Sequence, residues 1–320
     1  MIRVGIIGGA GYTAGELIRL LVFHPEVELV FVHSESNAGN ALWEVHGGLI
    51  GDTDLHFCSE FNLSGIDVLF LCSAHGKSQA FWETHPKPEG LKVIDLAQDF
   101  RDEKDGYVYG LPEWQRDKIQ SADKVANPGC FATAIQLALL PLAAAGLLTG
   151  EIHVTAVTGS TGAGVKPAAT THFSWRTDNL STYKVFTHQH LQEIGRTLGL
   201  LQPGLDVPIR FIPVRGDFAR GIFATLTLPC GLSQEAATTL FEDYYATAPF
   251  TWVSKHPADL KQAVNTNKCI LYPEIHDGQL VITSVIDNLL KGASGQAVQN
   301  MNLVCGLPED TGLKLKASAF

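Results

Sequence analysis

Residues 4–21 of the chain read VGIIGGAGYTAGELIRLL, and this stretch decides the fold. A short apolar strand pattern leads into a glycine turn, and the turn leads into a helix pattern whose apolar face carries Leu17, Leu20 and Leu21. Read from Gly9, the turn matches G-x-G-x-x-A, in which glycines let the backbone approach a pyrophosphate at the helix N-terminus. The pattern predicts a dinucleotide site contacted by Gly8, Gly9, Gly11, Tyr12 and Thr13. The alternative is a tight strand-to-helix turn that binds no ligand.

The rest of the chain divides into two kinds of pattern. In the first half, helical patterns alternate with short apolar runs that are typical of buried parallel strands: Val4–Ile7, Val27–Val32, Val68–Cys72 and Val93–Asp95. The second half has longer β-rich segments, at Ile152–Thr158, Ile209–Val214, Ile222–Leu228, Ile270–Ile275 and Leu280–Val285. We predict an α/β fold, with a Rossmann-type doubly wound parallel sheet plus an α+β domain that has a mostly antiparallel sheet.

Helix-like apolar sequence returns at Gly292–Cys305, after the last of these strands. We therefore predict a dinucleotide-binding domain over residues 1–126, completed by a C-terminal helix over 290–320 that packs back onto it. Residues 127–289 are the predicted catalytic, substrate-binding and oligomerisation domain. An open antiparallel sheet in that domain has a face or an edge to bury, which favours a homo-oligomer.

Composition excludes several classes of protein. The chain has 320 residues, of which 45% are hydrophobic and 18% charged, as in an ordinary globular protein of two domains. Its net charge of −10 argues against nucleic acid or an anionic membrane as a partner, and favours a small-molecule substrate. The N-terminus lacks a signal-peptide pattern, and the chain has no uninterrupted apolar stretch of about 18 residues. Six cysteines without a C-x-x-C pair indicate a reducing compartment, so we expect a cytoplasmic protein.

The motif Asn127-Pro128-Gly129-Cys130 precedes the apolar run FATAIQLALLP. Asn-Pro-Gly is a turn signal, so a helix is predicted to begin at or just after Gly129. The thiol of Cys130 then lies at a helix N-terminus, where the helix dipole and unpaired N–H groups favour a thiolate. The same N–H groups are suited to holding an oxyanion. We predict that Cys130 is a nucleophile; the alternative is a buried structural cysteine.

Two imidazoles and a carboxylate fall within six residues in His188-Gln189-His190-Leu191-Gln192-Glu193. If a helix begins here, Glu193 lies one turn from His190, close enough for a hydrogen bond. We predict that one histidine is the acid/base and that Glu193 orients it, and the sequence leaves open which histidine it is. The H-x-H pair also allows a zinc site, but no third strong ligand is nearby, so we predict no metal. Surface histidines without a role are the remaining alternative.

The segment His33-Ser34-Glu35-Ser36-Asn37 follows the second predicted strand, where an acidic residue usually binds the ribose of NAD. Small hydroxyl groups at Ser34 and Ser36 favour NADP(H) over NAD(H). Glu35 opposes this choice if its carboxylate points toward the 2′-phosphate. Ser73, in the loop after the next strand, is a further expected cofactor contact because the carboxyl ends of parallel strands bind the ligand.

Four further features are candidates for binding substrate or cofactor. Arg101 has a planar fork suited to a carboxylate or phosphate, although an arginine paired with Asp is an equal alternative. Asn127, at the start of the cysteine motif, is a second candidate for contact with the substrate. The segment 159–164, GSTGAG, offers flexible backbone N–H groups to a phosphate or cofactor edge, with contacts expected at Gly162 and Gly164. Asn288 is suited to binding a carboxamide through its donor and its acceptor. Ordinary loops and helix caps are the alternatives.

Several motifs, taken together and in order, resemble one family. They are GGAGYTAGEL at 8–17, IDLAQDFR at 94–101, YGLPE at 109–113, NPGC at 127–130, HQH at 188–190 and DNLLKGASGQAVQNMN at 287–302. The chain is similar, over nearly its whole length, to the N-acetyl-gamma-glutamyl-phosphate reductases of arginine biosynthesis, relatives of aspartate-semialdehyde dehydrogenase. Two departures are Glu35, where the family usually carries a basic residue nearby, and Ser160-Thr161-Gly162, where it usually carries Ser-Gly.

The resemblance implies an NADP-dependent oxidoreductase that forms a dimer or a tetramer. Cys130 would attack an acyl phosphate and form a thioester, which hydride from NADPH would reduce to N-acyl-glutamate 5-semialdehyde. A histidine, His188 or His190, would act as the acid/base, the 8–15 loop would hold the pyrophosphate, and Asn288 would contact the nicotinamide. An acetyl or a succinyl group on the substrate, an aspartyl or aminoadipyl phosphate, and a non-catalytic NADP-binding redox sensor remain alternatives.

Overall fold

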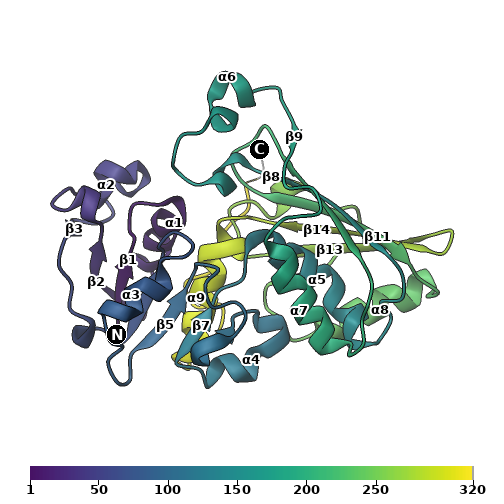
Figure 1. Ribbon diagram of the computed structural model, residues 1–320, viewed down its shortest axis with the longest axis horizontal. Helices are drawn as coiled ribbons and strands as arrows, with labels where there is room; N and C mark the ends of the chain where they lie inside the picture. The colour runs from purple at the N-terminus through teal and green to yellow at the C-terminus, as the bar shows by residue number, and fades with distance from the viewer. Residues whose placement is uncertain (319–320) are drawn as a thin grey trace. The chain divides into compact units, whose positions relative to one another are not determined.

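A computed structural model describes residues 1–318 of the chain as two compact units. Unit 1 comprises residues 1–128 and 293–314, and unit 2 comprises residues 129–292 together with 315–318. Figure 1 shows both units with their helices and strands labelled. Each unit contains one seven-stranded sheet, and each is described by itself below.

The sheet of unit 1 is wholly parallel, in the order β3-β2-β1-β4-β5-β7-β6. Its strands are β1 (Ile2–Ile7), β2 (Val27–His33), β3 (Phe57–Cys58), β4 (Val68–Leu71), β5 (Lys92–Asp95), β6 (Val108–Tyr109) and β7 (Lys124–Ala126). The strand order reverses between β1 and β4, which makes this position the switch point of a doubly wound sheet. Such a sheet binds its ligand at the switch point, beyond the carboxyl ends of the strands.

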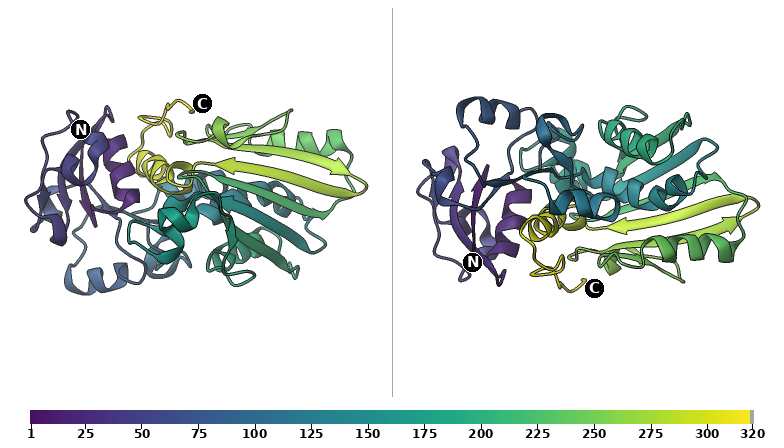
Figure 2. Two further views of the ribbon diagram at one scale, coloured as in Figure 1. Left: turned by 90° about the horizontal axis from the view of Figure 1, so that it is seen from above. Right: turned by 90° about the horizontal axis from the view of Figure 1, so that it is seen from below.

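Five α-helices belong to unit 1: α1 (Tyr12–Leu21), α2 (Leu42–Val45), α3 (Ser78–Thr84), α4 (Pro112–Gln120) and α9 (Gly295–Val304). Every residue of α9 is buried, and the helix packs against α1 and α4. Figure 2 shows α9, in yellow, beside α1, in purple. Short 3₁₀ segments lie at η1 (Glu35–Asn37), η2 (Gly47–Leu49), η3 (Leu63–Gly65) and η4 (Lys104–Gly106).

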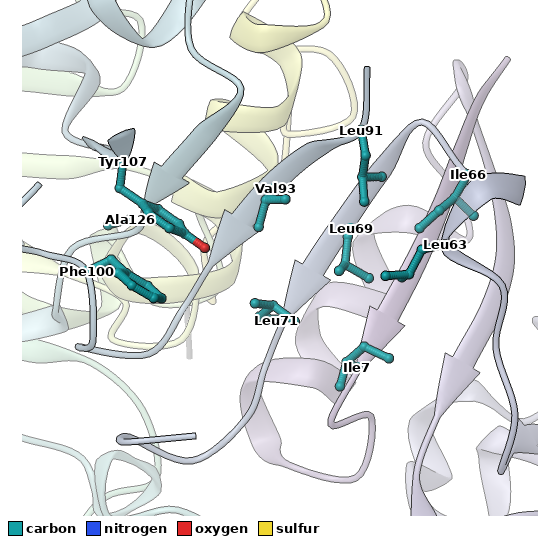
Figure 3. Close-up of a cluster of buried hydrophobic side chains, with 10 residues drawn as sticks. All are labelled: Ile7, Leu63, Ile66, Leu69, Leu71, Leu91, Val93, Phe100, Tyr107 and Ala126. Atoms are coloured by element: carbon teal, nitrogen blue, oxygen red, sulfur yellow. The ribbon is translucent and has the colours of Figure 1, made fainter. Parts of the chain in front are cut away.

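A cluster of apolar side chains forms part of the core of unit 1 and is drawn in Figure 3. Strands β1, β4 and β5 contribute Ile7, Leu69, Leu71 and Val93, which line one face of the sheet. At the end of this cluster, the rings of Phe100 and Tyr107 stack with centroids 4.2 Å apart. Strands that are buried on both faces explain why the sequence shows continuous apolar runs rather than alternation.

The sheet of unit 2 is mixed, in the order β12-β13-β14-β11-β8-β10-β9. Its strands are β8 (Ile152–Thr158), β9 (Ser181–Thr182), β10 (Ile209–Arg215), β11 (Ile222–Pro229), β12 (Thr251–Val253), β13 (Cys269–His276) and β14 (Gln279–Ile286). The β8/β10 and β12/β13 pairings are parallel and the other four are antiparallel. Figure 2 shows β13 and β14 running side by side as a long hairpin.

Four α-helices belong to unit 2: α5 (Cys130–Ala144), α6 (Phe173–Arg176), α7 (His190–Leu201) and α8 (Gln234–Tyr244). Helix α5 is apolar on all sides and is buried from Phe131 to Ala143, because it lies between α7 and strands β11 and β14. The excursion that carries α6 and β9 leaves the sheet after β8 and returns along its edge at β10 (Figure 1). Unit 2 also contains η5 (Ser160–Ala163), η6 (Ala169–Thr171) and η7 (Leu260–Gln262), and a π-helical turn, η8 (Leu290–Ser294), leads into α9.

The predicted fold class is confirmed, and the nine predicted strands all occur with ends within two residues of those expected. The short strands β3, β6, β7, β9 and β12 were missed, because two or three residues show no periodicity. The C-terminal helix predicted over 290–320 is wrong in length. It ends at Val304, and Gly306 then adopts a left-handed conformation (φ 71°) just before Pro308. Residues 319 and 320 of that prediction lie outside the described residues.

None of the helices within residues 1–318 combines the length and the apolar character that crossing a bilayer requires.

Candidate active site

Cys130 is the first residue of α5, so the helix starts where the turn motif predicts. Gly129 is the N-cap, and its carbonyl accepts the first helical hydrogen bond, from the Thr133 N–H at 2.8 Å. The first turn contains no acidic residue, and glycine offers no side chain to cap the helix. The positive end of the helix dipole therefore lies at the thiol.

The segment before α9 packs directly against Cys130. A Cβ placed on Gly292 would lie 2.7 Å from the Cβ of Cys130, so any larger residue at this position must displace one of the two. Asp287 shapes this segment: its carboxylate is fully buried, pairs with Arg220 at 3.0 Å and accepts the N–H groups of Leu289 and Leu290. A buried charge is stable only when its oxygens are satisfied in this way.

The two predicted histidines lie beside the start of α5. The ring centroid of His188 lies 5.4 Å from that of Phe131 and 4.5 Å from that of His190. Both histidines are buried. The Nδ1 atom of His188 accepts the backbone N–H of His190 at 3.2 Å, which leaves the proton of the neutral ring on Nε2. Burial, and secondly the charge of Lys184, lower the pKa of His188 to about 4. His188 is therefore neutral near pH 7.

Glu193 does not make the predicted hydrogen bond to His190. Its Oε1 lies 3.9 Å from Nε2 of His190, which is within ion-pair range but too long for a hydrogen bond. Its Oε2 instead accepts the backbone N–H of Gly129 at 3.1 Å, so Glu193 on α7 binds the N-cap residue of the helix that begins with Cys130. Glu193 thus connects the cysteine segment with the histidine segment, which the spacing within HQHLQE cannot reveal.

The 159–164 loop differs from the prediction that it offers free N–H groups. Ser160 and Thr161 donate theirs to Phe218 and Ala219, and the N–H groups of Gly162 and Gly164 bond within the loop. The side chain of Asn288 is also engaged, because its Oδ1 accepts from the Gly221 N–H at 2.7 Å and its Nδ2 donates to Thr161 Oγ1 at 3.0 Å. A carboxamide bound through both atoms of Asn288 would have to replace these bonds.

In unit 1, the glycine turn has the geometry of an anion cradle. Gly8 has φ 83°, and a Cβ there would lie 2.9 Å from the Cys72 carbonyl, beside the N–H of Ser73. A Cβ on Gly11 would meet nothing within 4 Å, and α1 begins at Tyr12 with neither a side-chain cap nor an acidic first turn. An uncapped helix N-terminus with open space before it is suited to a pyrophosphate, so these residues fit a dinucleotide.

The serines predicted to face the ribose lie together at the end of β2. Asn37 donates to the Oγ atoms of Ser34 at 3.3 Å and Ser36 at 3.0 Å, and Glu35 between them is exposed to solvent. The structure thus brings Ser34, Ser36, Ser73 and the glycine turn to the carboxyl ends of adjacent strands.

Arg101 and Asn127 are buried structural residues rather than open contacts. Arg101 is 8% exposed, and its guanidinium donates to the carbonyls of Asn127 at 2.9 Å and Leu96 at 3.2 Å. Asn127 is 1% exposed; it donates to the carbonyl of Ala293 and accepts from Asn300. Because both side chains bond within unit 1, a substrate could reach them only by exchanging these bonds. Burial of this kind depends on partners far along the chain and leaves no local signal.

Among residues 1–318, no group of three or more His, Cys, Asp or Glu side chains is placed to hold a metal ion. None of the six cysteines, all within the described range, forms a disulfide there.

Three residues near Cys130 were missed by the sequence analysis: Tyr183, Arg215 and Gly292. The ring of Tyr183 lies 5.9 Å from His188, and the Arg215 guanidinium lies over the Tyr183 ring at 4.7 Å. Arg215 stands at the end of a predicted strand, which is a weak signal, and Tyr183 lies in a segment without periodicity. For Gly292, the signal was its place within the family motif at 287–302.

Comparison with protein-family models shows two matches, which together cover most of the chain. Residues 3–122 match the NAD binding domain of semialdehyde dehydrogenases, and residues 130–288 match their dimerisation domain. Solved structures agree on the fold. Aspartate semialdehyde dehydrogenase II of Vibrio cholerae, complexed with ASA, is similar with a TM-score of 0.74 at 18% identity, over 96% of this chain and 98% of that chain. The enzyme of Candida albicans with NADP gives 0.70 at 14% identity, over 95% and 98%. The fold and the site thus define a protein of the semialdehyde dehydrogenase class.

Curated relatives are similar over their full lengths. The N-acetyl-gamma-glutamyl-phosphate reductases of Azobacteroides pseudotrichonymphae and Bacteroides thetaiotaomicron are each 58% identical to this chain, over 100% of both chains. That of Flavobacterium johnsoniae is 52% identical, again over 100% of both. The chain belongs to the N-acetyl-gamma-glutamyl-phosphate reductase family.

Proposed function

We propose that this chain catalyses the NADPH-dependent reductive dephosphorylation of N-acetyl-gamma-glutamyl phosphate, giving N-acetyl-glutamate 5-semialdehyde and phosphate in arginine biosynthesis. One observation carries the proposal: relatives that share 52–58% of their residues over the full length are named for this activity. The fold likeness to aspartate semialdehyde dehydrogenases, at 14–19% identity, supports the class of chemistry but does not select the substrate.

Cys130 is the proposed nucleophile. Its thiolate attacks the acyl carbonyl, the C–S bond forms, and the C–O bond to phosphate breaks, which leaves a thioester. The N-terminus of α5 provides the positive end of a dipole where the carbonyl oxygen becomes negative. Gly292 supports this step by its size, because it leaves room for the Cys130 side chain.

We assign the acid/base role to His190, with His188 as its neutral neighbour. Oε1 of Glu193 lies 3.9 Å from Nε2 of His190, so a carboxylate faces the ring that would carry the proton, whereas burial lowers the pKa of His188 to about 4. His190 would donate its proton as the aldehyde leaves the sulfur, and Glu193 would hold both His190 and Gly129 in position.

The cofactor is NADP(H), and when bound it supplies the hydride that reduces the thioester. In unit 1 the residues proposed to hold it are those of the glycine turn, Gly8, Gly9, Gly11, Tyr12 and Thr13, with Ser34 and Ser36 toward the ribose and Ser73 beside the turn. From unit 2, Gly162, Gly164 and Asn288 remain candidates. Residues 1–126 with the C-terminal segment would thus form the cofactor domain, and 127–289 the catalytic domain.

We further propose that the protein is a homo-oligomer that works in the cytoplasm. The outer face of the unit 2 sheet is only partly covered and carries apolar and hydroxyl side chains, and the matching family model for this unit is a dimerisation domain. A nucleophilic thiol, in a chain whose described cysteines form no disulfide, is suited to a reducing environment.

The reverse reaction tests the proposal. NADPH formation is followed with NADP, phosphate and N-acetyl-glutamate 5-semialdehyde, with the N-succinyl analogue and aspartate semialdehyde alongside. Turnover of the N-acetyl substrate supports the assignment. Turnover of aspartate semialdehyde alone would move the chain to the sister activity, and no turnover would favour a redox sensor.

Cys130→Ser tests the nucleophile. We expect turnover to fall more than about a thousandfold, because a serine hydroxyl is scarcely ionised near pH 7, while NADPH binding measured by fluorescence is unchanged. Cys230→Ser is the matched control, since Cys230 lies just beyond β11, outside the proposed site. Retained turnover in the Cys130 variant would refute the assignment.

A further inference from the structure

Arg215 lies within a short chain of side chains that begins at the nucleophile. The carbon of its guanidinium lies 4.7 Å from the ring centroid of Tyr183. The ring centroids of Tyr183 and His188 are 5.9 Å apart, and those of His188 and Phe131, the residue after Cys130, are 5.4 Å apart. Burial, and secondly the charge of the Cys130 thiolate, raise the pKa of Tyr183 to about 12, whereas the charge of Arg215 and its hydrogen bond to the Tyr183 side chain act to lower it. All five residues belong to unit 2.

Part of the hydrogen-bonding capacity of Arg215 is unused, although its side chain also bonds to that of Tyr183. Its Nε is buried and has no hydrogen-bond partner within residues 1–318. One terminal nitrogen lies 3.5 Å from Thr170 Oγ1, the outer limit for a hydrogen bond, and no described carboxylate lies within ion-pair distance. Buried donors are almost always paired in native proteins, so a charged fork in this state indicates a ligand that completes it.

A second arginine holds Arg215 in place. The Arg176 guanidinium is 5% exposed and donates to the carbonyl oxygens of Arg215 at 2.8 Å and Asn179 at 3.0 Å, and to Thr170 and Ser181. These bonds fix the end of β10 to the excursion that carries α6. Burial, and secondly the Arg215 charge, lower the pKa of Arg176, because two guanidinium groups lie close together.

Little negative charge offsets this pair. Asp217 is near enough for its charge to act on Arg176 and offsets one of the two positive charges; its Oδ2 also accepts the N–H of Asp178 at 2.6 Å. Lys184, which lowers the pKa of His188, adds a third positive charge and donates to Gln189 rather than to a carboxylate. The surroundings of Arg215 therefore attract an anion.

We propose that Arg215 binds the α-carboxylate of the substrate and thereby selects for it, with Arg176 as a positioning residue. The inference rests on the proposed function. In N-acetyl-gamma-glutamyl phosphate, four carbon–carbon bonds separate the carbonyl that Cys130 attacks from the carboxylate carbon. A planar guanidinium accepts a carboxylate in a bidentate arrangement, and the neighbouring buried Nε gains the partner that it lacks.

Two aldehydes that differ only in this group test the proposal in the reverse reaction. N-acetyl-glutamate 5-semialdehyde carries the α-carboxylate, and 4-acetamidobutanal has hydrogen in its place. For Arg215→Met we expect kcat/KM for the first aldehyde to fall about 10- to 100-fold, mainly through KM, as for loss of a charged hydrogen bond. We expect the value for 4-acetamidobutanal to change less than about threefold, because that substrate makes no such bond.

Arg215→Lys retains the charge without the fork, so it should show an intermediate loss and serves if the methionine variant folds poorly. Arg210→Met is the matched control, since Arg210 lies on the same strand but pairs with the exposed Glu151; its selectivity should equal that of the wild type. An equal loss with both aldehydes, a change confined to the KM of phosphate, or no change would overturn the proposal. If the wild-type protein turns over neither aldehyde, the proposed function fails first.

Discussion

His188 and His190 lie only two residues apart, yet their surroundings assign them different roles. His188 packs between aromatic rings and accepts a backbone N–H, so a proton on its Nδ1 would break that bond. His190 faces the Glu193 carboxylate. This difference is the basis for proposing His190, rather than His188, as the proton donor.

The lowered pKa of His188 predicts a pH dependence of stability. Its pKa is about 4 in the folded protein against an ordinary value of 6.5, so between these values the unfolded chain binds a proton that the folded chain does not. The free energy of unfolding therefore falls as the pH is lowered from about 6.5 to about 4. In His188→Gln this component is absent, and the urea midpoint should decline less steeply over that range.

The exposed His172 offers the control for this measurement, because His172→Gln should leave the wild-type slope unchanged. Equal slopes for wild type and His188→Gln would contradict the assignment of a buried, neutral His188.

At the scale of elements, the site depends on the contact between α5 and α7. Gln136 on α5 is fully buried and donates to the Glu193 carbonyl at 3.1 Å and the Thr197 hydroxyl at 2.9 Å, both on α7. Together with the bond from Gly129 to Glu193, these contacts set the position of α7 along α5. The proposed nucleophile is on one helix and the proposed acid/base on the other, so this position decides whether the two side chains meet.

We expect Gln136→Leu to lower the free energy of unfolding by about 1–3 kcal/mol, because it leaves the buried Thr197 hydroxyl without its donor. Adding Thr197→Val removes the unsatisfied group, so the double variant should recover part of the loss in urea denaturation. Kinetics add a second readout: kcat should fall in both variants, since neither restores the bonds between the helices. If the two substitutions are simply additive in stability, the hydrogen bond between these side chains is not the cause.

At the scale of the whole molecule, each unit builds its own sheet and core. Unit 2 leaves one sheet face incompletely covered: Thr155, Thr225, Val281 and Thr283 are partly or fully exposed there, while their neighbours along each strand are buried against α5 and α8. Threonine and valine at the centre of such a face form a surface that another copy of the chain can cover without unpaired charge.

Thr225→Arg should weaken self-association, because it places a charge at the centre of this face. Sedimentation velocity should show the mass falling from a multiple of 34.6 kDa toward that of one chain. Ser121→Arg, on an exposed position of unit 1, should leave the mass unchanged. An unchanged mass in Thr225→Arg would show that another surface joins the copies.

Much of the fold could be read from local patterns. The glycine turn at Gly8–Gly11, the apolar strands and the start of α5 at Cys130 each depend on residues within one turn or strand, where φ, periodicity and capping act. The same holds for the spacing of His190 and Glu193 on one face of α7. The short strands were not predicted, because pairing with neighbouring strands, rather than their own sequence, makes these segments extended.

The sequence by itself determined the two types of sheet, the helix N-terminus at the thiol and the family of the chain. The reason is that strand and helix periodicity, and each motif, depend on residues that are close together in the sequence. Only the tertiary structure decided what the polar side chains do. Arg101 and Asn127 bond to buried partners from other segments, Glu193 binds the N–H of the N-cap residue of α5, and the Nε of Arg215 is left without a hydrogen-bond partner. The physical reason is that the state of a buried polar group depends on which donors and acceptors distant segments bring to it.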